Sequence, residues 1–234
     1  MYCFHKSFLF GLLVSFVFLL PVDSFGQSLK CPVDYGYQWT RSFGNAKAWL
    51  SVGKLSEIDP AVAQRINEQL RKRVGDTFFK RLKFEYGRAD DLDSSEPLKA
   101  DQSKRIDGYD FVFEFSDRKK GLSAFHFKIE VDGSGKIFEK TLPLPDISEH
   151  PEKSILISCQ QAMAIAKRNG FTPKRSSLIF VYDWDADVFT WVVTDSKEVQ
   201  PDQPSFLIGG TYRKIDIEAH SGRVLKIYKE TIVV

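Results

Sequence analysis

The side chains that commonly perform catalysis are sparse and scattered in this chain. After the first 26 residues only three histidines remain, His126, His150 and His220, and none of them stands in an HExxH motif. There is no CxxC pair and no serine in a GxSxG context. The motifs of zinc hydrolysis, thiol redox chemistry and acyl transfer are therefore absent from the sequence. We expect a protein that is not an enzyme and has no catalytic residue, no cofactor and no metal.

Three carboxylates in the stretch "DWDAD" stand at alternate positions, Asp183, Asp185 and Asp187. Oxygen ligands at this spacing are typical of a calcium loop, which also needs glycine at its sixth position and glutamate at its twelfth. This chain has Val188 and Thr194 there. We therefore interpret the stretch as a solvated turn between two strands, since aspartate favours such bends.

The cysteines suggest a disulfide. Loss of an N-terminal signal would remove Cys3 and leave Cys31 and Cys159 as an even pair, which in an oxidising compartment favours a bond between them. The alternative, two buried and reduced thiols, stays open. Cys159 also falls in the first turn of an expected helix, where the helix dipole stabilises a thiolate. No base for a redox role is visible, so we favour the structural interpretations.

The charges are nearly balanced, with a formal net charge of +2. That balance favours neither nucleic acid nor any other strongly charged partner. Basic runs occur at residues 71–73, at residues 80–81 and at residues 117–120. We interpret them as solvated surface, with an acidic partner as the alternative.

The first 26 residues have the pattern of a signal peptide. Lys6 precedes an uncharged apolar run over residues 7–20, and small residues precede an expected cleavage before Gln27. The apolar run is shorter than the roughly 20 residues that span a bilayer, which disfavours an uncleaved anchor. A lipidated Cys31 is a third alternative, disfavoured by the lysine before it. We expect export to the periplasm or the medium, with no stable membrane insertion after cleavage.

The elements that must position any site occur twice. "IEVDGSGKI" at residues 129–137 is echoed by "IDIEAHSGRV" at residues 215–224, and the same order of elements precedes each. In residues 59–145, Asp59 and Pro60 begin a helix that Gly75 ends. Period-two alternation then predicts strands over residues 78–86, 109–116 and 125–131, with a shorter one over residues 136–141. Phe78, Leu82, Phe84 and Tyr86 form the predicted inward face of the first strand.

The second unit, residues 155–234, repeats this plan. Ser158 and Gln161 predict a capping box for a helix that Gly170 ends. Strands are expected over residues 176–182, 188–194, 211–219 and 223–230, and the last hairpin has the apolar set Ile215, Ile217, Leu225 and Ile227. The predicted fold class is α+β, with two tandem repeats, each one helix packed on a four-stranded antiparallel sheet.

The two units should pack together or join sheets, because one helix on one small sheet buries little apolar surface. Prolines mark the linker, residues 146–154. The leader, residues 27–58, matches neither unit. Trp39, Phe43, Trp49 and Leu50 predict that it packs against the repeats.

The first unit departs from the repeat through a long polar insertion, residues 87–108. Its composition predicts a mobile loop. The alternative is a partner-binding arm, since loops on a rigid scaffold often carry recognition. Its candidate binding residues are Arg88, Asp90, Asp91, Asp93, Lys104 and Arg105.

The second unit resembles a PepSY domain over residues 155–230. The resemblance rests on the helix "ISCQQAMAIAKRNG", the run "FTWVV" and the closing hairpin "YRKIDIEAHSGRVLKI". Ala162 and Ala166 match the helix alanines of that family, Trp191 matches its tryptophan, and residues 221–224 match its closing turn. The first unit keeps the turn at residues 134–137 but has no counterpart of the tryptophan.

This resemblance implies a small module of exported or envelope proteins that binds and restrains proteases or other envelope proteins. Our leading hypothesis is a non-enzymatic protein-binding module that inhibits a secreted or envelope protease or assists envelope assembly. The alternative is a carrier that holds a small apolar ligand between the two repeats, suggested by Trp184, Trp191 and the rows of phenylalanine.

Overall fold

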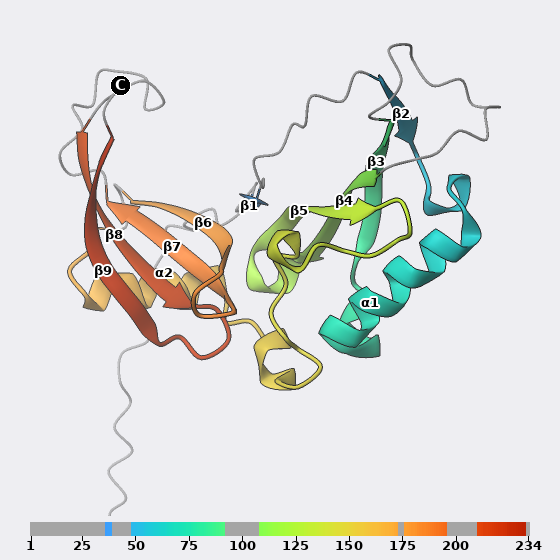
Figure 1. The fold of residues 1–234 in the computed structure, drawn as a ribbon. Coiled ribbons are helices and arrows are strands. Elements are labelled where there is room, and N and C mark those ends of the chain that lie inside the picture. The colour runs from blue at the N-terminus through green and yellow to red at the C-terminus, as the bar shows by residue number, and fades with distance from the viewer. Residues whose placement is uncertain (1–35, 39–47, 92–107, 173–175, 196–209, 233–234) are drawn as a thin grey trace, which may run out of the picture.

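The computed structural model describes residues 36–38, 48–91, 108–172, 176–195 and 210–232. The fold is α+β and consists of two repeated units that lie side by side (Figure 1). Residues 1–26, which we expect to be a signal peptide, lie outside the described residues, as do Cys31, Trp39 and Phe43. None of the described helices is both long and apolar enough to cross a membrane.

The first sheet has five strands in the order β1-β5-β4-β3-β2. Its central strands are β3 (Lys83–Asp91), β4 (Gly108–Asp117) and β5 (Leu122–Asp132). The leader adds β2 (Ala48–Val52), antiparallel to β3, and β1 (Gly36–Gln38), parallel to β5. Since Val52 is buried in the core, the leader packs against the repeats as expected. β1 also lies beside the second unit, near its first strand.

The strand predicted over residues 136–141 is wrong. Only an isolated bridge joins Ile137 to Val131, and a 3-10 turn, η3 (Glu139–Thr141), follows. The side chain of Gln69 donates to the Gly135 carbonyl at 2.7 Å and accepts from the Ile137 N–H at 3.0 Å. These two bonds tie the chain to the first helix. The chain still lies beside β5, where the Phe138 N–H donates to the Glu130 carbonyl at 2.9 Å. The Thr141 hydroxyl oxygen, rather than a backbone carbonyl, accepts from the Glu130 N–H at 3.0 Å, so no regular strand pairing forms.

The first helix, α1 (Pro60–Phe79), begins as predicted. The Asp59 carboxylate accepts from the N–H groups of Ala61 and Val62, and Pro60 occupies the first turn. Gly75, where we predicted that the helix ends, has φ of 70° and interrupts α1 without ending it. The chain then makes one more helical turn, which buries Phe78. The prediction of a strand that starts at Phe78 is therefore wrong, because β3 begins only at Lys83.

Tyr86 does not face inward as predicted. The register between β3 and β4 shifts between Phe84 and Tyr86, and this irregularity leaves Tyr86 52% exposed. Gly87 is instead buried over the ring of Phe111. By contrast, the inward sets of the next two strands are confirmed, and all are buried: Tyr109, Phe111, Phe113, Phe115, Phe125, Phe127, Ile129 and Val131.

The second unit contains α2 (Cys159–Arg168) and a sheet in the order β6-β7-β8-β9. Both hydrogen bonds of the Ser158–Gln161 capping box are present, which confirms that prediction. The strands are β6 (Ser176–Asp183), β7 (Val188–Asp195), β8 (Gly210–Glu218) and β9 (Val224–Ile232). Trp191 is fully buried, and its indole N–H donates to the Ile157 carbonyl at 3.3 Å.

The apolar set predicted for the last hairpin is only half correct. Ile215 and Ile217 are fully buried, but Ile227 is 44% exposed. β9 is the outermost strand, and its register with β8 shifts between Asp216 and Ile217. Ile227 pairs directly with the buried Ile215, so its exposure comes from its place on the edge strand, which alternation in the sequence does not reveal.

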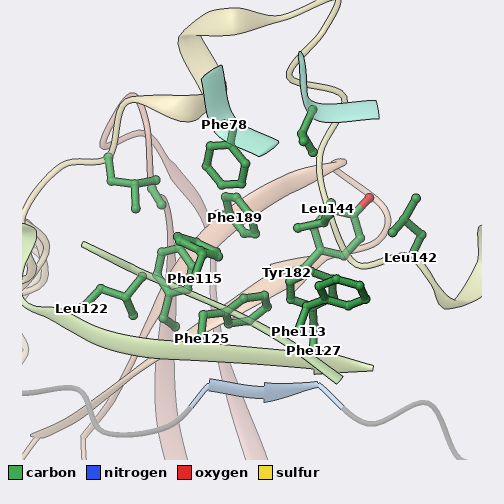
Figure 2. Close-up of a cluster of buried hydrophobic side chains, with 14 of the residues drawn as sticks. Phe78, Phe113, Phe115, Leu122, Phe125, Phe127, Leu142, Leu144, Tyr182 and Phe189 are labelled. Atoms are coloured by element: carbon green, nitrogen blue, oxygen red, sulfur yellow. The ribbon is translucent and has the colours of Figure 1, made fainter. Parts of the chain in front are cut away.

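One aromatic cluster joins the two units into a single core. Phe115 lies 5.2 Å from Phe189 between ring centroids, Phe125 lies 5.5 Å from Phe180, and Phe78 lies 6.1 Å from Phe189. Figure 2 shows Phe78, Phe115, Phe125 and Phe189 gathered between the two units. The sheets remain separate, so the units pack together and do not join sheets.

The segment between the units is also part of the core. Leu142, Leu144 and Ile147 are buried, and Figure 2 shows the first two beside the aromatic cluster. The N–H groups of Ile147 and Ser148 both donate to the Arg73 carbonyl, at 3.1 and 3.2 Å. These bonds satisfy a carbonyl near the interrupted end of α1, so the segment fixes the helix to the second unit.

We predict that Gly87→Ala destabilises the protein by about 1–3 kcal/mol, the usual cost of overpacking. A Cβ at Gly87 would lie 2.3 Å from Cδ1 of Phe111 and 3.0 Å from the Asp110 carbonyl oxygen. Gly53→Ala is the matched control, because its Cβ would meet only Glu57 at an ordinary 3.5 Å. Urea unfolding of the two variants measures the difference. Equal stability of both variants would contradict the packing described for β3.

Candidate functional site

A cleft of about 690 Å³ lies between the two repeats. One wall comes from α1 and the segment after β5, and the other from the β6–β7 turn and residues 146–149. The cleft is lined by Gln69, Lys72, Arg73, Lys136, Ile137, Glu139, Lys140, Leu142, Asp146, Ser148, Glu149, Tyr182, Trp184 and Asp187. Smaller hollows lie along α1, but this cleft has both repeats in its walls.

Arg73 connects three parts of the fold at the base of the cleft. Its Nε donates to the Leu144 carbonyl at 2.8 Å, and its Nη2 donates to Oδ1 of Asp187 at 2.5 Å. Nη1 lies 3.7 Å from Oδ2 of Asp146. One guanidinium therefore holds α1, the segment between the units and the β6–β7 turn together.

The carboxylate of Asp187 accepts hydrogen bonds from three further groups besides Arg73. Oδ1 also accepts from the Tyr182 hydroxyl at 2.6 Å, and Oδ2 accepts from Nζ of Lys153 at 2.9 Å and from the Asp146 N–H at 3.1 Å. Lys153 belongs to the 3-10 turn η4 (Pro151–Ser154) and also donates to the Asp187 carbonyl. The four donors and this carboxylate form a clamp between the repeats, which we call the Asp187 clamp.

The clamp sets the ionisation of its members. Burial raises the pKa of Asp187, but the hydrogen bonds from Tyr182, Lys153 and the Asp146 N–H, together with the charge of Arg73, outweigh burial, so the net pKa is lowered. Burial raises the pKa of Tyr182, and the hydrogen bond to Asp187 raises it further. The carboxylate is therefore anionic and the phenol neutral at physiological pH, as the bonds between them require.

The turn predicted from "DWDAD" is confirmed, but the role of its last residue was missed. Oδ1 of Asp183 accepts from the N–H groups of Asp185 and Ala186, which closes the turn. Asp187 has φ of 52°, a left-handed conformation that aspartate tolerates better than most residues. No group of three or more histidine, cysteine or acidic side chains is arranged to hold a metal within the described ranges.

Two of the basic residues interpreted as solvated surface are only partly exposed. Arg73 is part of the clamp. Arg81 pairs with Asp117 at 3.2 Å and lies over the ring of Phe78, 4.8 Å from its centroid. The sequence carries no signal for either role, because the acidic partners are far away along the chain.

Trp184 forms part of the rim of the cleft. Its side chain is 41% exposed and meets Tyr182 edge to face, with 4.8 Å between ring centroids. Lys72, Lys136 and Lys140 stand exposed on the opposite wall. The cleft lining therefore combines an exposed aromatic side chain and charged groups with the buried Ile137 and Leu142.

Three of the six candidate loop residues lie in the part of the chain that the structure describes, and none of these three lines the cleft. Arg88, Asp90 and Asp91 lie in β3, whose pairing with β4 shortens the insertion, and Asp93, Lys104 and Arg105 lie outside the described residues. Arg88 pairs with Asp110 at 2.9 Å, and the same carboxylate lies 3.4 Å from Nζ of Lys128. This charge cluster is on the first sheet, and the partner-binding role of the six residues stays a prediction.

Cys159 is fully buried in the first turn of α2 and is disulfide-bonded. Its partner lies outside the described residues, so a bond to Cys31 stays a prediction. A disulfide to a residue before α1 would tie the N-terminal part of the chain to the second unit.

No protein-family model and no curated protein matches this chain. Among solved structures, the chain is similar to a "putative lipoprotein" from Clostridium difficile 630. The identity is 18%, and the match covers 54% of this chain and 77% of that chain, with a TM-score of 0.24. A likeness this slight carries no argument about fold or function.

We predict that Asp187→Asn destabilises the protein by about 1–2 kcal/mol at neutral pH. Asparagine keeps the left-handed backbone conformation but removes the charge that faces Arg73 and Lys153. The expected loss is below that of a fully buried pair because the Asp187 side chain is 34% exposed. Asp185→Asn in the same turn is the control, since Asp185 is exposed and only its N–H contributes to the turn.

This difference should depend on pH. Because the folded state lowers the pKa of Asp187, its contribution is complete above the unfolded value of about 3.9 and is lost as the pH falls through the lower folded value. Urea unfolding of wild type and Asp187→Asn should therefore differ at pH 7 and converge in acid. A difference that persists unchanged in acid would contradict the ionic clamp.

Proposed function

We propose that this chain is an exported, non-enzymatic protein-binding module made of two PepSY-like repeats. In this proposal each repeat is one helix on four antiparallel strands, to which the first unit adds the short parallel strand β1. The protein restrains a secreted or envelope protease or assists envelope assembly. The observation that supports it best is the cleft between the repeats, where Trp184 stands 41% exposed beside charged side chains.

The cleft has the composition of a protein interface. Such interfaces combine an apolar centre with a polar rim, and tryptophan, tyrosine and arginine contribute most of their binding energy. Here the exposed Trp184 packs against the buried Tyr182, whose hydroxyl lies 3.5 Å from Nη2 of Arg73, and all three line the cleft. The Asp187 clamp holds these side chains in place before any partner arrives, which lowers the entropic cost of binding.

A carrier of a small apolar ligand is a second proposal with less support. Of the aromatic residues that suggest it, only Trp184 is at the cleft. Trp191 and the phenylalanines of the cluster are packed against one another in the core, with Phe180 4.7 Å from Trp191 between ring centroids. The charged lining of the cleft also suits a peptide better than an apolar molecule.

Affinity capture tests the proposed function. The exported protein, purified from the cells that make it, serves as bait for their envelope and secreted fractions. A Trp191→Ala bait is the matched control, because it removes a fully buried side chain and disrupts the second repeat. We expect the native bait to retain a protein that free native protein displaces and that the control bait does not retain.

Protease activity in the same fractions is measured with and without added protein. A retained protease that loses activity supports restraint, and a retained protein without protease activity supports assembly. If the native bait retains nothing beyond the control bait, and no protease activity changes, the proposed function is wrong.

A further inference from the structure

The charges in the cleft fall into two groups. Asp146 and Asp187 are compensated by Arg73, and Asp187 also by Lys153. Lys72, Lys136 and Lys140 are exposed and form no ion pair within the part of the chain that the structure describes. The second group is available to a ligand without breaking the clamp.

The unpaired lysines share one wall. Lys72 comes from α1, and Lys136 and Lys140 come from the segment that Gln69 ties to that helix. Two exposed carboxylates, Glu139 and Glu149, also line the rim. Once the clamp residues are set aside, three cations face two anions, so the lysine wall has an excess of positive charge.

Apolar surface adjoins the lysine wall. Ile137 and Leu142, both largely buried, also line the cleft, and Trp184 of the second repeat is 41% exposed in it. Figure 2 shows Leu142, Leu144 and Tyr182 close together at this end of the core. A segment lying along the cleft would meet lysine ammonium groups on one side and an indole on the other.

We propose that the cleft seats an extended peptide segment of a partner protein, with carboxylates against Lys72, Lys136 and Lys140 and an aromatic or large aliphatic side chain against Trp184. This inference rests on the proposed function and names the chemistry of the partner. Each carboxylate gains a charge-assisted hydrogen bond from a lysine, and the apolar side chain removes the exposed indole from water. Lysine at those peptide positions would meet like charges on the wall, which supplies specificity.

The probe is a fluorescein-labelled peptide, Gly-Glu-Asp-Phe-Glu-Asp-Phe-Gly, followed by fluorescence anisotropy with the full exported protein. The test variant is the triple change Lys72→Glu, Lys136→Glu and Lys140→Glu. The matched control carries Lys54→Glu, Lys119→Glu and Lys229→Glu, three exposed lysines that do not line the cleft. Both variants change the net charge equally, so they separate a local effect from a general one.

We expect the cleft variant to weaken binding by at least about tenfold and the control by no more than about twofold. Trp184→Ala should weaken binding by about fivefold or more, since aromatic anchors dominate such contacts. Binding should also weaken as salt rises from about 50 mM to about 500 mM, because exposed charges are screened. A peptide with lysine in place of each acidic residue should not compete.

Equal weakening by the two triple variants would overturn the inference, as would an unaffected Trp184→Ala variant or no binding of the peptide to wild type. The capture experiment separates this failure from failure of the proposed function. If the native and cleft-variant baits retain the same protein equally, the function stands and the cleft is not its site. If neither bait retains a protein, the function itself fails.

Discussion

The structure depends on aromatic packing between the two repeats. Each repeat alone offers one helix and a small sheet, which bury too little apolar surface for a stable core. Phe115 and Phe125 from the first sheet meet Phe180 and Phe189 from the second, at centroid distances from 5.2 to 6.0 Å. Phe78 closes the cluster from the extra turn of α1. The repeats are therefore halves of one core, although their strands belong to separate sheets.

The cleft follows from this arrangement. Packing the two sheets through their aromatic faces brings the end of α1 next to the β6–β7 turn, where Arg73 and Asp187 meet. The pair is partly buried and surrounded by further hydrogen-bond donors. Because hydrogen bonds are directional and apolar packing is not, this pair fixes the position of one repeat relative to the other. The lysine wall and Trp184 keep their separation because both walls are anchored to this core.

Local signals in the sequence predicted much of the fold. The caps at Asp59 and Ser158, the interruption at Gly75 and the inward faces of β4 and β5 follow from residue types within a few positions of each other. The errors arose where distant contacts override local pattern. Tyr86 turns outward at an irregularity in the strand pairing, and the chain after Gly135 bonds to Gln69 of α1 as well as to β5, so it does not form a regular strand.

The site was harder to predict than the fold. Asp187 was identified as a turn residue, but its partners Arg73 and Lys153 are 114 and 34 positions away along the chain. Only the packing of one repeat on the other brings them together, and no spacing rule encodes that packing. The sequence shows Trp184 only as an aromatic residue, and its place in the cleft with residues of α1 follows from the packing of the two repeats.

Native-state hydrogen exchange on a Phe189→Ala variant tests most directly whether the repeats share one core. Phe189 belongs to the second repeat but contacts the rings of Phe78, Phe115 and Phe125 in the first. A shared core predicts that the most protected amides of β4 and β7 lose the same opening free energy, about 3–5 kcal/mol. If protection falls in β7 while the amides of β4 keep their wild-type values, the repeats are independent domains and the account is wrong.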